Sequence, residues 1–346
     1  MSLENFVKLL PKVELHLHLE GAVAAATFGD LAAQNGIDLP GGKAAAALYD
    51  YSSLVDFLKI YDLVCASIRT AADFSRVTFE ALERCAAGGA RYVEFFFSPH
   101  AHLKHGVSYE TMLEGILAGM RKAEVELALH SRLIPAHSRE LGPEAGELFL
   151  DMVLAERLPE VIGIGLDYNE LPFPPAPFAA LYQRAREAGL KVTAHAGETG
   201  PSSYVADSID LLGVRRIDHG YHVVDDAALM ERCRRDGIVF TCCPSTTLGT
   251  TVWTDLAAPD HAIRQMIEAG LTVTINSDDP PMFGTTLDRE YLLVATHFGL
   301  SLGDLKRLAL AGLNAAWLDD FTRQTWISAW SREIDLLTET ELASAA

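Results

Sequence analysis

The sequence predicts an α/β protein whose parallel strands close into a (β/α)8 barrel, and three observations predict it. Short apolar runs rich in β-forming residues recur eight times along the 346 residues. Stretches with helical apolar spacing separate most of these runs, and several end in glycine just before the next run, as in "EAGLKV", "RDGIVF" and "EAGLTV". Because neighbouring parallel strands need a crossover of a dozen or more residues, this alternation favours a parallel sheet.

The predicted elements follow in order along the chain. The strands are expected over residues 13–19, 90–97, 129–136, 161–167, 190–195, 216–219, 238–242 and 271–276, with helices such as 74–87, 109–124, 177–188, 203–212, 227–235 and 262–269 between them. Eight units fit a closed TIM barrel better than an open doubly wound sheet, because no glycine-rich phosphate loop follows the first run. Further helical patterns predict an insertion or lid over 22–72 and C-terminal helices over 284–346, all within one domain spanning 1–346.

Composition and charge exclude several classes of partner. With 28 basic and 47 acidic residues, the net charge of −19 repels nucleic acid and anionic membrane surfaces. No window approaches the ~18 consecutive apolar residues of a membrane span. The five cysteines are an odd, sparse set without a Cys-x-x-Cys pair, which is typical of free thiols in a reducing compartment. Since the start of the chain also lacks an export signal, we expect a cytoplasmic protein that binds neither nucleic acid nor membrane. The oligomeric state stays open.

The stretch "VELHLHLEG" places polar and apolar side chains at alternate positions. In a strand, Glu14, His16, His18 and Glu20 share one face, so two imidazoles lie side by side. A half-exposed edge strand would have this pattern. Half of a metal site would have it too.

Ionisable residues follow nearly every predicted strand, at the barrel rim where catalytic groups of this architecture gather. His16 and His18 on the first strand, His195 ending the fifth and Asp278 ending the eighth converge if the barrel closes, because strands eight and one are then neighbours. Three imidazoles and a carboxylate suit zinc, which keeps one position for water in catalytic sites. The sequence therefore predicts one catalytic zinc.

Proton transfer requires further groups near such a metal. Glu198, three residues after His195, is placed to act as an acid, and His219, ending the sixth strand, to orient or deprotonate the water. We expect the adjacent Asp278 and Asp279 to point apart, one toward the metal and the other toward substrate. Asp279 would otherwise only cap the turn before Pro280.

Four segments together, "LPKVELHLHLEG", "AHAGETGP", "RIDHGYH" and "INSDDPPMFGTTL", resemble the adenosine/adenine deaminase family of zinc aminohydrolases. The resemblance spans nearly the whole barrel, with the motifs in family order. It implies hydrolytic removal of the 6-amino group of a purine, giving inosine or hypoxanthine and ammonia. It also implies zinc ligation by His16, His18, His195 and Asp278, protonation of ring N1 by Glu198, handling of the water by His219, and binding of the purine by Asp279.

Two departures from the family pattern bear on the substrate. Glu20 stands where members that prefer adenosine usually carry aspartate close to the ribose, and the fourth strand ends in "LDYNE" without the glycine that presents backbone to the ring. Both features resemble the adenine-type branch, whereas "GYH" and "FGTTLDREY" resemble the adenosine branch. Adenine, adenosine, a modified adenine nucleoside and N6-substituted adenine all remain open as substrates. Another hydrolase of the same metal superfamily and a non-catalytic binding barrel are the alternatives.

Other histidines and cysteines carry weaker signals. His100, His102 and His105 form a second cluster, which we expect to wall the substrate mouth rather than to bind a second metal. His222 either lines the site or caps a turn. The pair Cys242 and Cys243 is expected at the buried end of the seventh strand.

Overall fold

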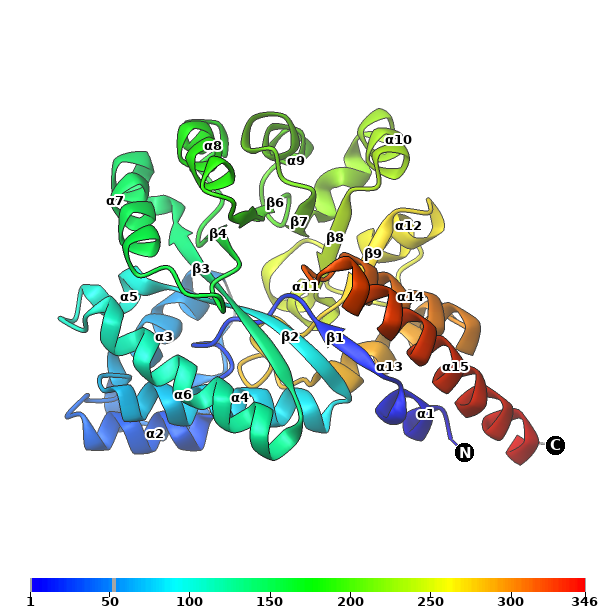
Figure 1. Ribbon diagram of the computed structural model, residues 1–346, viewed down its shortest axis with the longest axis horizontal. Coiled ribbons are helices and arrows are strands. Elements are labelled where there is room, and N and C mark those ends of the chain that lie inside the picture. Colours follow the sequence, from blue (N-terminus) through cyan, green and yellow to red (C-terminus); the bar gives the residue numbers. More distant parts are fainter. Residues whose placement is uncertain (1, 52–53, 346) are drawn as a thin grey trace.

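A computed structural model describes residues 2–51 and 54–345, and these form a barrel of parallel strands surrounded by helices (Figure 1). Strands β1(Lys12–Glu14), β2(Ala90–Phe97), β3(His130–Ser138), β4(Gly163–Asp167) and β5(Lys191–Val192) pair in chain order, and so do β6(Ala194–Ala196), β7(Arg216–His219), β8(Val239–Cys242) and β9(Thr272–Ile275). Only Thr193 separates β5 from β6, so these two are halves of the predicted fifth strand.

The barrel closes between its last and first strands. The backbone of Asp278 donates to the carbonyl of His16 (2.9 Å), and the Asp278 carbonyl accepts from the N–H of His18 (3.0 Å). The first strand therefore continues past Glu14, with Leu17 and His18 also paired to Phe96 of β2. The predicted closed barrel is confirmed, and the open doubly wound alternative is wrong.

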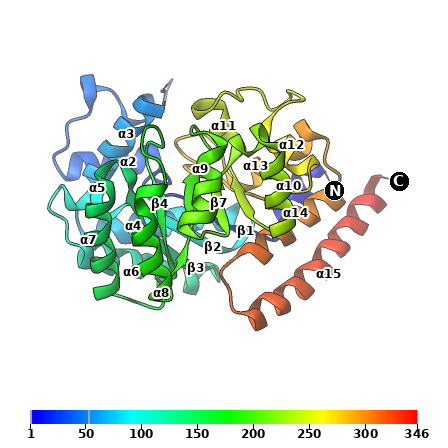
Figure 2. The same cartoon turned by 90° about the horizontal axis from the view of Figure 1, so that it is seen from above.

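Helices cover the outside of the barrel and extend the chain at both ends (Figures 1 and 2). Most of the outer helices follow a strand: α4(Ala71–Ala87), α6(Tyr109–Leu127), α7(Gly142–Ala155), α8(Ala179–Glu187), α9(Ser202–Asp207), α10(Ala227–Asp236), α12(Ala262–Glu268) and α14(Leu302–Ala315). Local sequence sets their ends. Thr70 and Ser301 form capping boxes with Asp73 and Asp304, and Gly237 ends α10 in the left-handed region.

The remaining helices lie outside this regular alternation. Helix α1(Leu3–Leu9) precedes the first strand, while α2(Ala25–Gln34) and α3(Leu54–Ser67) follow it. Short helices α5(Pro99–Leu103) and α11(Pro244–Thr250) begin where β2 and β8 end, and α13(Leu287–Phe298) and α15(Asp320–Ala345) lie in the C-terminal part. The extra helices expected after strand one and at the C-terminus are confirmed, whereas lid motion of the first group stays a prediction. No helix in the described ranges has the length and apolarity to span a membrane.

The interior of the barrel is closed at its amino-terminal end. Glu94 pairs with Arg216 (2.6 Å), both side chains being essentially fully buried, and the Arg216 guanidinium stacks 3.7 Å from the centre of the Trp317 ring. Above this pair, Phe96, Ile134 and Ala136 fill the interior. Only the carboxyl ends of the strands are left to hold a site, as in other barrels of this class.

Candidate metal centre and active site

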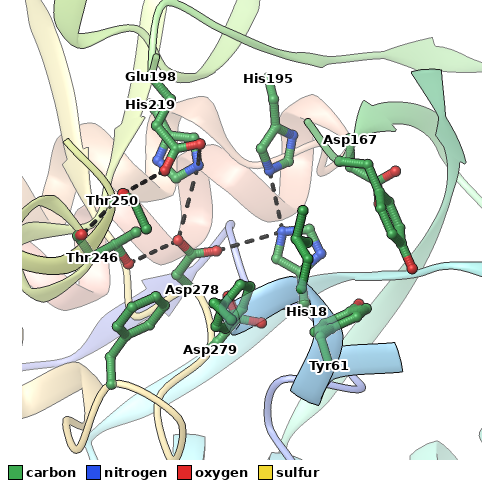
Figure 3. Close-up of a pocket in the computed structure, with 14 residues that line it drawn as sticks. His18, Tyr61, Asp167, His195, Glu198, His219, Thr246, Thr250, Asp278 and Asp279 are labelled. Carbon is green, nitrogen blue, oxygen red and sulfur yellow. Dashed lines mark hydrogen bonds and ion pairs between the residues drawn. The ribbon is translucent and has the colours of Figure 1, made fainter. Parts of the chain in front are cut away.

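The imidazoles of His16, His18 and His195 converge inside the carboxyl end of the barrel. His18 Nε2 lies 3.2 Å from His195 Nε2, and ligand atoms from all three histidines lie within 4.8 Å of one another. Asp278 Oδ1 is 3.3 Å from His16 Nε2 and 3.5 Å from His18 Nε2. The structure thus brings together the four residues expected to bind a metal (Figure 3 draws three of them).

The polar face of the first strand is buried, so the edge-strand alternative is wrong. Glu14, His16 and Glu20 have no exposed surface, and His18 is only 7% exposed. Glu14 accepts hydrogen bonds from the His16 backbone (3.2 Å) and from the Ser277 hydroxyl (2.6 Å), which ties the first strand to the segment after β9. This contact fixes the direction in which the two histidines point.

A second layer of hydrogen bonds orients the imidazoles. His16 Nδ1 lies 2.8 Å from the hydroxyl of Thr241, which donates to Asp218 (3.1 Å). Asp218 is also 3.5 Å from Nδ1 of His195. One carboxylate near the end of β7 therefore orients two histidines, His195 directly and His16 through Thr241, as expected around a metal centre. Sequence reasoning missed Asp218, although it lies in the segment "RIDHGYH".

The donor set fits a cation. His16 Nε2 is buried, and the group that faces it among the described residues is the Asp278 carboxylate, 3.3 Å away. Burial lowers the pKa of His18 to about 4 and that of His195 well below its usual range, so both present neutral nitrogens. Burial also opposes protonation of His16, but the Asp278 carboxylate outweighs it and raises the His16 pKa to about 9. Asp278 and His16 thus form an ion pair, in which a divalent cation would replace the proton.

Glu198 and His219 lie beside this cluster. Glu198 Oε1 accepts a hydrogen bond from Thr250 (2.7 Å), and Glu198 Oε2 is 3.8 Å from His219 Nε2. His219 Nε2 is in turn 3.9 Å from Asp278, which accepts from Thr246 (2.8 Å) (Figure 3). Burial, reinforced by the charge of Asp278, raises the pKa of Glu198 to about 8, which keeps this side chain protonated at neutral pH. The pocket therefore places a protonated carboxyl group beside the cluster of possible metal ligands.

The loop that carries Glu198 is held by Glu170, a residue that sequence reasoning did not single out. Glu170 accepts hydrogen bonds from the backbone N–H groups of residues 197–200, at 3.0 Å for Glu198, 2.9 Å for Thr199 and 2.7 Å for Gly200. Arg139, also missed and fully buried, donates to the carbonyls of His195 and Phe173. Glu170, which follows β4, therefore holds the loop after β6, and Arg139, which follows β3, holds the backbone of β6 itself.

Asp279 follows Asp278 in the chain and also lines the pocket (Figure 3). We expected the two carboxylates to point apart, and this stays a prediction. Burial, reinforced by repulsion from Asp278 and a hydrogen bond to it, raises the pKa of Asp279 well above its usual range. Its Oδ1 packs against Gly21, where a Cβ atom would stand only 1.5 Å away. This contact explains the glycine that follows Glu20.

Glu20 does not line the pocket but stands behind Tyr61, which does. Its carboxylate accepts from the Ser98 backbone (2.9 Å) and the Tyr61 hydroxyl (3.0 Å) and lies 2.9 Å from His102 Nε2. Glu20, His102 and the buried Cys65 are close enough to hold a cation. However, burial raises the pKa of that thiol well above its usual range, and a thiol is a poor ligand. Direct contact of Glu20 with substrate stays a prediction.

The second histidine cluster has structural contacts. His100 pairs with Nδ1 of His137 (2.9 Å), whose other nitrogen lies 2.9 Å from the Gly142 carbonyl. None of His100, His102 and His105 lines the pocket, so the expectation that they wall its mouth is wrong. His222 lies 2.7 Å from Asp225 and does not line the pocket, which favours the alternative that His222 caps a turn.

Cys242 and Cys243 are buried at the end of β8, as expected. Cys243 also lies with His16, His219 and Asp278 in a group of possible ligands. Burial raises the pKa of the Cys243 thiol well above its usual range, which disfavours the thiolate that a metal would require.

The pocket encloses about 470 Å³ of empty space, a figure that includes its open mouth. Phe57, Leu58 and Tyr61 of α3 cover it, and Phe283 lies after Asp279. Three lining residues, Tyr168, His219 and Asp278, have φ of 66°, 67° and 62°, in the left-handed region that side chains avoid. Such strain concentrates at functional sites.

Comparison with known proteins gives a consistent result. The chain matches the family model described as adenosine deaminase over residues 11–331. It is 40% identical over 327 residues to the adenine deaminase of Caulobacter vibrioides, with 94% of each chain covered. The crystal structure of adenine deaminase from Arthrobacter aurescens has a TM-score of 0.89 at 34% identity, covering 94% of this chain and 99% of that one. A zinc-bound amidohydrolase of Burkholderia ambifaria gives 0.91 at 36% identity, covering 99% and 96%. The chain belongs to the adenosine deaminase family.

Proposed function

We propose that this chain is a zinc-dependent hydrolase that converts adenine to hypoxanthine and ammonia. The observation that carries the proposal is the convergence of three imidazoles and Asp278 beside the protonated Glu198 in one pocket. The names of the relatives support the reaction and favour the free base over adenosine. Five buried free cysteines support a reducing compartment such as the cytoplasm.

In this proposal His16, His18, His195 and Asp278 hold one zinc ion. When bound, the ion supplies a Lewis acid that lowers the pKa of a coordinated water toward ~7. Asp218 and Thr241 keep two of the imidazoles in position, and Thr246 holds the outer oxygen of Asp278.

The chain's own groups would transfer the protons. Glu198 donates its proton to N1 of the purine, which makes C6 electron-poor. His219, 3.8 Å from Glu198 and 3.9 Å from Asp278, takes a proton from the attacking water. Asp279, protonated and facing the pocket, hydrogen-bonds the ring. The phenyl and phenol rings of Phe57 and Tyr61 exclude bulk solvent from the bound base.

The test follows the loss of absorbance of the adenine band, with adenine, adenosine and N6-substituted adenines as substrates. We expect turnover of adenine that a chelator abolishes and zinc restores. Glu198→Gln should lower the rate by about 10²–10⁴-fold while metal content stays unchanged. The exposed Glu126→Gln on α6 is the matched control. Chelator-insensitive turnover, or activity on a lactone or ester but on no 6-aminopurine, would favour another hydrolase.

A further inference from the structure

Asp167 occupies the position directly across the barrel from Asp278. Asp167 ends the fourth strand, and Asp278 follows the eighth strand. In a closed ring of eight strands, the fourth and eighth lie opposite one another. Both residues line the same pocket, and Figure 3 shows Asp167 on the far side of His18 and His195 from Glu198.

One oxygen of this carboxyl group has no partner in the described part of the chain. Asp167 is 2% exposed, and its Oδ2 accepts a hydrogen bond from the Ser98 hydroxyl (3.0 Å). Oδ1 is buried and accepts no hydrogen bond. A buried polar atom without a partner costs about 1–3 kcal/mol, so a pocket that contains one is suited to a ligand that donates there.

The shape of a purine determines which of its atoms would meet Asp167. The proposed function places C6 beside the metal-binding cluster. In the six-membered ring of a purine, the atom opposite C6 is N3, and N9 is bonded to C4, the carbon next to N3. The group across the barrel from Asp278 therefore faces the edge formed by N3 and N9. N9 carries a hydrogen in the free base and a sugar in the nucleoside.

We propose that Asp167 selects the free base over the nucleoside by accepting a hydrogen bond from N9–H of adenine at Oδ1. This inference rests on the proposed function, because the reaction at C6 fixes the orientation of the ring. A nucleoside would bring a sugar carbon against a buried carboxyl oxygen, leaving that oxygen without a donor. Specificity of this kind is strong, because the wrong substrate leaves a buried polar group unpaired.

The wall around Asp167 is braced against the outward movement that a sugar would require. Tyr168 keeps a left-handed backbone and hydrogen-bonds Asp62 of α3 (3.3 Å), and its ring meets the ring of Tyr61 edge to face with centroids 6.0 Å apart. Tyr61 in turn donates to Glu20 (3.0 Å). Glu20 would thus influence substrate specificity indirectly, by holding Tyr61 in this wall.

The test compares adenine with 9-methyladenine, which has no N9–H, on zinc-loaded protein. Wild type should prefer adenine strongly. In Asp167→Ala, kcat/KM for adenine should fall by about 10- to 100-fold, mainly through KM, while the value for 9-methyladenine stays the same or rises. Asp167→Asn, which keeps a carbonyl acceptor, should restore part of the preference. Asp38→Ala on the exposed surface is the control.

Binding measurements make the result independent of turnover. In a competition binding assay, the wild type should bind hypoxanthine more tightly than 9-methylhypoxanthine, and Asp167→Ala should remove this preference. Circular dichroism checks that the variant is folded. If Asp167→Ala lowers kcat/KM equally for adenine and 9-methyladenine, or leaves the ratio of the two binding affinities unchanged, the role of Asp167 is overturned and the proposed function is left intact. Absence of turnover of every 6-aminopurine by the zinc-loaded wild type overturns the proposed function, and the binding preference then decides the role of Asp167 alone.

Discussion

Glu170→Gln should separate the positioning of Glu198 from the proposed role of Glu198 as the proton donor. Glu170 is 2% exposed, and its two oxygens accept from four consecutive backbone N–H groups of the loop that carries Glu198. One oxygen accepts from Gly197 alone, and the other accepts from the remaining three. A glutamine is almost the same size but offers only one oxygen and adds an amide donor.

The magnitude follows from that arrangement. In the orientation that keeps more hydrogen bonds, the glutamine carbonyl oxygen accepts from three N–H groups, while the amide NH₂ group faces the N–H of Gly197. The hydrogen bond from Gly197 is then lost, and the other three are made to a neutral acceptor in place of a charged one. Hydrogen bonds to charged groups contribute about 1.5–3 kcal/mol each, and an opposed pair of donors costs more. We expect Glu170→Gln to destabilise the fold by roughly 2–4 kcal/mol. A displaced Glu198 should also reduce kcat by on the order of 10²-fold.

A double-mutant cycle tests this reasoning. The assay is kcat for adenine, with urea unfolding as the stability readout, for wild type, Glu170→Gln, Glu198→Gln and the pair. If Glu170 acts through Glu198, Glu170→Gln should lower the stability of the Glu198→Gln protein but hardly change its residual rate. Two results would refute this reasoning: a kcat of the double variant that is lowered by the product of the two single losses, or a Glu170→Gln enzyme whose kcat lies within threefold of the wild-type value.

Three further variants probe other contacts. Gly21→Ala should reduce kcat/KM at least tenfold, because its Cβ would displace Asp279. Gly303→Ala on α14 should be neutral, because a Cβ there would meet the Ser301 hydroxyl at 3.6 Å, an ordinary contact distance. Glu94→Gln should cost about 3–5 kcal/mol in urea unfolding, since it leaves the Arg216 charge buried and unpaired. Burial lowers the pKa of Lys12 to about 7, so the folded state releases a proton that the unfolded state keeps, and stability should rise with pH above 7. Relative to Lys12→Met, wild type should gain about 3 kcal/mol between pH 7 and about 9.5.

The fold was predictable because its signals are local and repeated. Apolar strands, helical spacing and glycine at helix ends recur in each unit, and closure follows once eight units are counted. The break of the fifth strand at Thr193 carried no such signal. The hydroxyl of that residue donates to the Arg216 carbonyl and to Asp218 of the neighbouring strand, which only the folded chain brings near.

The candidate metal site was predictable for a different reason. Strand alternation puts His16 and His18 on one face, and the position of His195 and Asp278 at strand ends puts them on the same rim. The expected divergence of Asp278 and Asp279 stays a prediction, and its basis is weaker because it used strand alternation where the chain has already left the strand. Asp278 has φ of 62°, so the alternation no longer applies there.

The residues that sequence reasoning missed share one property, namely that each acts on backbone or side chains that belong to another strand or loop of the barrel. Glu170 holds a loop after β6, Arg139 holds the carbonyl of His195, and Asp218 orients two imidazoles. Each is an ordinary charged residue in the sequence, and its role depends on which strands become neighbours. A barrel makes those neighbours fixed and rigid, and the carboxyl ends of eight strands meet around one space. The residues that bind and react therefore leave a pattern in the sequence, whereas those that hold them in place become identifiable only through the hydrogen bonds of the folded chain.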